Sequence, residues 1–219
     1  MDGQGGDFYP VEPAQLLPLL PAPPENWKLT FSIAKERLSY ALLPETLAVR
    51  KYHFVPPLPP PGNPPSPPSP PKDITLTLID TGGDPERIRT FENFKPSPDP
   101  KGPNILVQGF EAVKVTNDPS TFLTIKISDR FLLSARFDNM SDREVDAWVQ
   151  LALPAQKMAD ASSASPNVPL QSGFITLSYI DELKPATNFQ SKASFQDKAD
   201  MKKALMHLQS HPTAAPSGP

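Results

Sequence analysis

The sequence contains no cysteine and only three histidines. Without cysteine, disulfide frameworks and thiolate metal sites are excluded. His207 and His211 lie four residues apart on a predicted helix, but no third ligand and no His-Glu-x-x-His motif accompany them. His53 has no serine or cysteine nucleophile motif beside it. We therefore expect no metal site and no bound cofactor.

Long apolar runs and excess positive charge are also missing. No stretch approaches the roughly 18 apolar residues of a membrane-spanning helix. The formal net charge is −3, the isoelectric point is about 5.6, and lysine and arginine are not clustered. Because nucleic-acid binding needs a basic patch, we expect no nucleic-acid partner and no transmembrane segment.

Proline is the abundant residue, with 31 copies, of which eleven lie in Pro56–Pro71. Proline fixes φ and has no N–H group, so this tract is restricted to polyproline II or irregular structure. Strand-like residues precede and follow it. We therefore expect residues 56–72 to form a long loop inside one domain, since the chain before the tract is too short to build its own core.

The remaining composition shifts predict the domain organisation. Residues 1–24 are rich in proline and glycine and carry no periodicity, so we expect an extended leader. Residues 25–209 are predicted to form a single domain with a mobile Ala/Ser/Pro-rich loop over 154–170. Residues 210–219 are expected to be a disordered tail.

The apolar pattern predicts an α+β fold. Alternation typical of half-buried strands occurs at Leu29–Ile33, Leu47–Val55, Ile74–Leu78, 105–137 and Phe174–Ile180. Such alternation favours a twisted, mainly antiparallel sheet with helices packed on one face. Ser128 and Asp129 are expected to form a two-residue hairpin turn. A short helical turn is expected around Ala34–Leu42.

Three longer helices are predicted as well. Ser141 with Glu144 three residues later is a capping box, and Val145, Trp148, Val149 and Ala152 follow at helical spacing. Asp84 and Pro85 have the residue types of a helix start, predicting a helix over Pro85–Phe94. A last helix is expected from Ser194 onward, with Met201 and Leu208 on its apolar stripe.

Asp80, Thr81 and Gly82, preceded by Leu78 and Ile79, resemble the catalytic triplet of aspartic peptidases. The resemblance implies that Asp80 shares a proton with a second aspartate from a dimer mate and activates water. The family's supporting pair of apolar residues before a downstream glycine is missing. The alternative is a turn at a strand end, closed by aspartate and glycine.

The end of the proline tract is a second candidate site. Pro67, Pro70, Pro71 and Lys72 form the PxxP-plus-cation pattern that SH3 domains bind in aromatic grooves. The alternative is a stiff, solvated loop, because a tract this rich in proline produces the pattern by chance.

These observations favour a non-catalytic binding or structural component with a protein partner. The Asp2–Asp7 run resembles the polar spacer of mature bacterial lipoproteins, so we expect a periplasmic or cell-envelope location, with the cytoplasm as the alternative. Two other functions stay open: a dimeric aspartic-peptidase-like hydrolase using Asp80, and an adaptor that presents the proline tract to an SH3-type domain.

Overall fold

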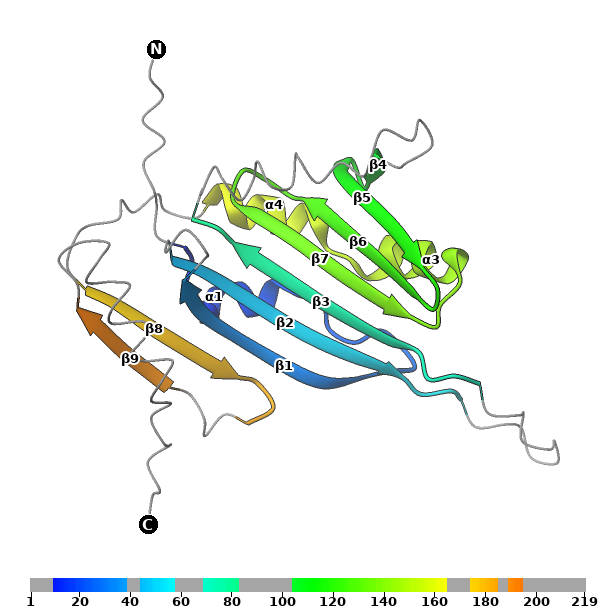
Figure 1. Cartoon of the computed structure of the whole chain (residues 1–219), viewed down its shortest axis with the longest axis horizontal. Coiled ribbons are helices and arrows are strands. Elements are labelled where there is room, and N and C mark those ends of the chain that lie inside the picture. Colours follow the sequence, from blue (N-terminus) through cyan, green and yellow to red (C-terminus); the bar gives the residue numbers. More distant parts are fainter. Residues whose placement is uncertain are drawn as a thin grey trace, which may run out of the picture.

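The computed structural model describes residues 10–38, 44–57, 69–82, 104–164, 174–184 and 189–194. Within them, nine strands form one antiparallel sheet in the order β4-β5-β6-β7-β3-β2-β1-β8-β9 (Figure 1). The strands are β1 (Trp27–Leu38), β2 (Pro44–Phe54), β3 (Asp73–Asp80), β4 (Asn104–Val107), β5 (Phe110–Asn117), β6 (Ser120–Lys126), β7 (Phe131–Asp138), β8 (Phe174–Asp181) and β9 (Phe189–Ser194).

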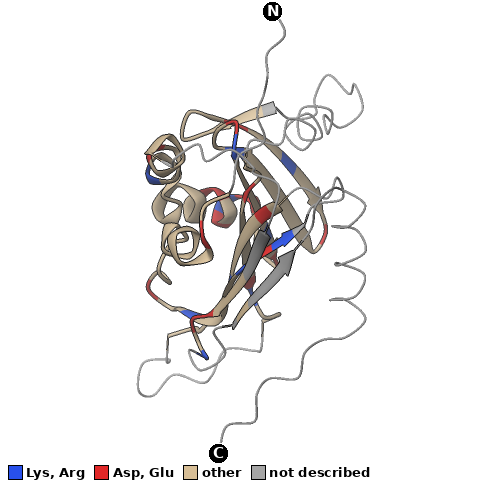
Figure 2. Ribbon diagram, turned by 90° about the vertical axis from the view of Figure 1, so that its left-hand side faces the viewer, with Lys and Arg blue, Asp and Glu red and all other residues tan. Residues whose placement is uncertain are grey.

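The four helical segments lie together on one side of the sheet (Figure 2). They are α1 (Pro13–Leu16), the 3₁₀ turn η1 (Leu17–Leu19), α3 (Asp142–Ala152) and α4 (Ala155–Ala164). The fold is α+β in the broad sense, but the sheet dominates it and the helices are short. The expected antiparallel pairing is confirmed for every strand pair among the described residues.

The strands form where the sequence alternates. In β3, Ile74, Leu76 and Leu78 are fully buried, whereas the threonines between them are half-buried. Successive side chains of a strand point to opposite faces, so the buried set faces the helices. The chain on either side of the proline tract forms the neighbouring strands β2 and β3, in register from Thr46 opposite Asp80 to His53 opposite Asp73.

Helix α3 is confirmed with the predicted capping box at Ser141 and Glu144. Its apolar stripe packs on the sheet through Trp148, whose ring lies 5.9 Å from that of Tyr52 and 5.8 Å from that of Phe137. Burying one large side chain of this kind contributes about 1.5–3 kcal/mol, so Trp148 is the main anchor of the helix.

The expected leader is wrong for residues 10–24. Residues 13–19 form α1 and η1, and Val11, Leu16, Leu17 and Leu20 belong to the main core. Prolines do flank these leucines, but Pro13 and Pro18 occupy the first positions of their helical segments, where a missing N–H group does no harm. Apolar burial then outweighs the low helix propensity.

The expected mobile loop over 154–170 is wrong for residues 155–164, which form α4. Ala155, Met158 and Ser162 are buried at helical spacing. The small residues of this stretch allow the helix to lie close to the sheet. Residues 165–170 lie outside the described part.

Two turn predictions are also corrected. The helical turn expected at Ala34–Leu42 is contradicted up to Leu38, because β1 continues that far and pairs with β2. Four residues, 127–130, separate β6 from β7 in place of a two-residue turn. Without the glycine that tight hairpin turns favour, the Ser128 hydroxyl closes this loop by accepting the N–H groups of Arg130 and Phe131.

Strand β9 was not predicted, although it pairs with β8 over six residue pairs. The predicted helices at Pro85–Phe94 and beyond Ser194, the tail 210–219, and the Asp2–Asp7 run all lie outside the described residues.

Candidate functional site

Asp80 is closed to solvent and has an arginine as its partner. The side chain is 0% exposed, and its carboxylate accepts hydrogen bonds from Arg130 at 2.8 and 3.2 Å. The backbone N–H groups of Val11 and Gly82 bind the same carboxylate at 2.6 and 2.9 Å. The neighbours of the Asp80 carboxylate are therefore cationic or N–H donors.

A shared-proton dyad has a different geometry, because it needs a second carboxylate and a water beside the first. Here the described neighbours of Asp80 occupy its carboxylate with hydrogen bonds and cover it. Thr81 donates its hydroxyl to the carbonyl oxygen of Arg130 at 3.1 Å. This places the triplet in the alternative role of a closed strand end, in which Asp80 also holds the N-terminal segment on the sheet.

The end of the proline tract lies beside α3. Pro70 and Pro71 are exposed, and the Pro71 carbonyl accepts a 2.6 Å hydrogen bond from Asn139. Lys72 forms an ion pair with Glu144. The Lys72 ammonium and the Ser141 backbone N–H lower the pKa of Glu144 to about 2. An SH3-type partner would have to compete with Glu144 for this cation. Pro67 lies outside the described residues.

Only one of the three histidines lies in the described part of the chain. His53 contacts Asp73 at 2.8 Å on the sheet surface, while His207 and His211 are outside the described part. No group of three metal-ligating side chains occurs among the described residues. In the same residues, no helix is long and apolar enough to cross a membrane.

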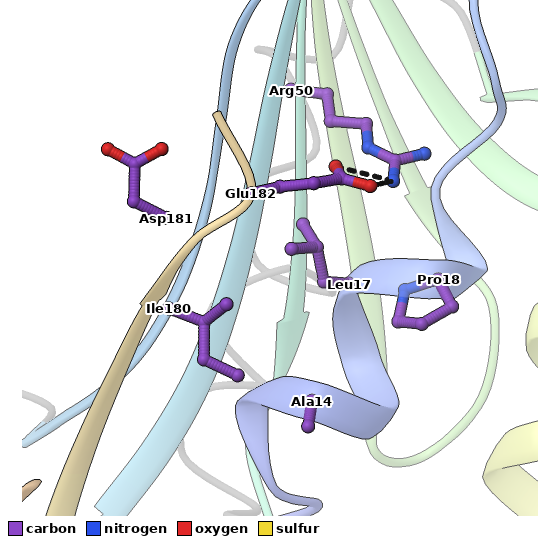
Figure 3. A pocket seen from close by; sticks show the side chains of 7 residues that line it. All are labelled: Ala14, Leu17, Pro18, Arg50, Ile180, Asp181 and Glu182. Atoms are coloured by element: carbon purple, nitrogen blue, oxygen red, sulfur yellow. Dashed lines mark hydrogen bonds and ion pairs between the residues drawn. The ribbon is translucent and has the colours of Figure 1, made fainter. Parts of the chain in front are cut away.

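A cavity of about 380 Å³ lies between α1, η1, β2 and β8 (Figure 3). The side chains of Ala14, Leu17, Pro18, Arg50, Ile180, Asp181 and Glu182 line it. Arg50 and Glu182 form its polar wall through hydrogen bonds of 2.8 and 3.0 Å, whereas Asp181 points away from the other lining residues.

The donors of Arg50 are all directed at protein oxygens. Its other groups bind the Ser32 hydroxyl at 3.2 Å and the carbonyls of Leu20 and Pro21 at 2.6 and 3.0 Å. Burial acts to raise the pKa of Glu182, but hydrogen bonds from Ser32 and Arg50 outweigh it and lower that pKa. Arg50 is thus a structural centre of this wall, with no donor left over for a ligand.

A different candidate surface lies on the sheet face opposite the helices. Cross-strand pairing places six residues in one row, which we call the open-face row: Val115, Phe122, Arg136, Thr75, Lys51 and Phe31. Chain neighbours of the row face the core, such as Tyr52 beside Lys51 and Phe137 beside Arg136. The row therefore points away from α3.

The open-face row combines exposed apolar groups with cations. Phe31, Val115 and Phe122 account for three of the seven exposed large apolar side chains among the described residues. Lys51 lies over the Phe31 ring at 5.3 Å, and Arg136 over the Phe122 ring at 5.7 Å. At about 4.7–4.9 Å between strands, Phe31 and Phe122 are about 19 Å apart.

The charge around this row is locally positive. The open-face row itself contains two cations and no carboxylate. In the next row on the same face, Lys28 adds a cation, and the carboxylates of Asp73 and Asp138 are bound by His53 and Arg136. Sequence reasoning missed this surface because each of the six residues comes from a different strand, and only the register of the strands brings them together.

Comparison with protein-family models, with curated proteins and with solved structures gave no match.

Proposed function

We propose that this protein is a non-catalytic binding component, and that its contact surface is the open-face row. The observation that most directly supports this proposal is the alignment of exposed aromatic, aliphatic and cationic side chains across six strands. The buried charged groups of Asp80 and Arg50 support the non-catalytic part of the proposal, because both are hydrogen-bonded to other groups of the protein.

The partner that fits this surface is an acidic, extended segment of another protein. Lys51 and Arg136 face solvent in the row. Arg136 also pairs with Asp138, but the two rows together carry three cations against two carboxylates, so a negative segment is favoured over a positive one. Phe31 and Phe122 offer ring surface toward the two ends, and aromatic side chains are typical anchors of protein interfaces.

The direct test measures binding of a defined peptide by fluorescence anisotropy. The probe is a labelled ten-residue peptide of alternating glutamate and proline, which is extended, acidic and able to pack on aromatic rings. We expect it to bind, and we expect the matching lysine–proline peptide not to bind. Affinity should fall as salt is added, since exposed charges are screened.

Two variants locate the binding on the open face. Lys51→Glu should lower the affinity for the glutamate–proline peptide at least tenfold. Arg143→Glu makes the same charge change at an exposed position on α3 and should leave that affinity nearly unchanged. Equal binding of both peptides, or equal effects of both variants, would contradict the proposal that the open-face row is the binding surface.

The expected cell-envelope location remains a prediction that fractionation of the producing cells would test.

A further inference from the structure

We infer that the N-terminal arm (residues 10–21) is exchangeable, so that two copies of this chain associate by each placing its arm on the other. The arm is not part of the sheet, because its only regular structure is α1 and η1. Releasing it therefore breaks no strand pairing. Among the described elements the same is true of α3 and α4, whereas releasing any strand would break its pairing with a neighbour.

The contacts of the arm resemble those of a bound ligand. Side chains of the domain bind its backbone carbonyls: Tyr52 holds Pro21 at 2.7 Å, Lys157 holds Pro18 at 3.2 Å, and Arg50 holds Leu20 and Pro21. Its other end is held where Asp80 accepts the Val11 N–H group. Such contacts form equally well with an arm from a second copy.

The receiving groups are oriented by the domain itself. Arg50 is fixed by Ser32 and Glu182, and Asp80 is fixed by Arg130 and Gly82. None of these supporting residues belongs to the arm. A site that is preorganised in this way binds an incoming segment without paying to order its own side chains.

The connection to β1 has the features of a hinge. Ala22, Pro23, Glu25 and Asn26 are exposed. The chain reverses here, with the Trp27 N–H group bonded to the Pro24 carbonyl at 3.0 Å and Asn26 at φ 65°. Proline favours an extended conformation in the residue before it, so Ala22 and Pro23 are restricted to extended backbone and the reversal is confined to the exposed residues Glu25 and Asn26.

Packing of the arm is incomplete on one side. The cavity of about 380 Å³ separates Ala14, Leu17 and Pro18 of the arm from Ile180 of β8 (Figure 3). Ala14 and Pro18, which line this hollow, are exposed, whereas Leu17 is buried. In a symmetric pair, each copy regains the same arm contacts, so only the hinge and the association itself change. The open-face row lies on the other side of the sheet and stays free.

Energy transfer between two labelled populations tests the exchange. One population carries a donor dye on Ala14→Cys in the arm, and the other carries an acceptor on Leu183→Cys beside the cavity. Both positions are exposed, and the absence of native cysteine makes the labelling specific. We expect energy transfer to develop over hours after mixing at high concentration, together with a doubled molar mass by light scattering.

The control is a doubly substituted chain, Ala14→Cys with Leu183→Cys, closed within one copy by a flexible bis-maleimide. It should stay monomeric and take no part in exchange. Two outcomes would overturn the inference: the mixed populations remain monomeric without transfer even after joint unfolding and refolding, or the closed chain dimerises as readily as the open one. Both readouts are independent of peptide binding by the open face.

Discussion

Asp80 shows how one residue can satisfy a functional motif and still have a structural role. Its carboxylate receives four hydrogen bonds, two from Arg130 and two from backbone N–H groups. Removing one member of a buried ion pair leaves the other charge uncompensated, which is much more damaging than losing an exposed pair.

Asp80→Asn should therefore destabilise the protein by about 3–5 kcal/mol, since Arg130 stays buried and charged. The measurement is urea unfolding at neutral pH. Asp129→Asn, at a side chain that is 93% exposed, is the control and should change stability by less than about 0.5 kcal/mol. A stable Asp80→Asn variant that has lost a hydrolytic activity of the wild type would instead support the peptidase interpretation.

Glu144 gives a pH dependence with a defined sign. Its pKa is about 2 in the folded protein against a usual 4.5, chiefly because of Lys72. A lowered folded-state pKa stabilises the fold above the unfolded value, and this contribution is lost as the pH falls from about 4.5 to about 2.

Wild type should therefore be more stable than Glu144→Gln at pH 7, and the difference should shrink as the pH falls through that window. Denaturant unfolding of both proteins across pH 2–7 measures it. A difference that stays constant with pH would show that the carboxylate charge contributes nothing.

At the scale of single elements, local pattern was sufficient where a segment carries its own signals. The α3 capping box and the strand alternation of β3 each lie within a few consecutive residues. The N-terminal arm and β9 lack such signals. Proline composition predicted an extended leader, but Leu16 and Leu20 pack on a core whose other half lies elsewhere in the sequence.

The arm should consequently contribute to stability like any other core element. Leu20 is 2% exposed, so Leu20→Ala should lower the free energy of unfolding by about 2–5 kcal/mol. Leu151 on α3 is 88% exposed, and Leu151→Ala should have little effect. Equal, small effects of both substitutions in thermal or urea unfolding would mean that the arm is not packed in solution.

For the whole molecule, the continuous sheet predicts one cooperative unit. The two tryptophans report on different regions: Trp27 begins β1 and packs edge-on to Phe54, while Trp148 anchors α3 over β2 and β7. Because β3 joins β7 to β2 without a break, loss of either part exposes the core of the other.

Trp27→Phe and Trp148→Phe each leave one tryptophan as the fluorescent reporter. In urea unfolding of each variant, the midpoint measured by fluorescence should coincide with the midpoint measured by far-UV circular dichroism. Residue Trp148 has no partner for its indole N–H among the described residues, so phenylalanine removes no hydrogen bond there. Separate transitions for fluorescence and circular dichroism would show two independently folding parts.

The sequence by itself determined the strands that alternate, the capped helix α3, and the absence of cysteine chemistry. These follow from periodicity and composition, which are local properties. Tertiary structure alone decided that Asp80 is covered by Arg130, that the arm fills the core, and that six residues from six strands align in the open-face row. Register and burial depend on pairing between distant segments, such as β3 with β7, and no local pattern contains that information.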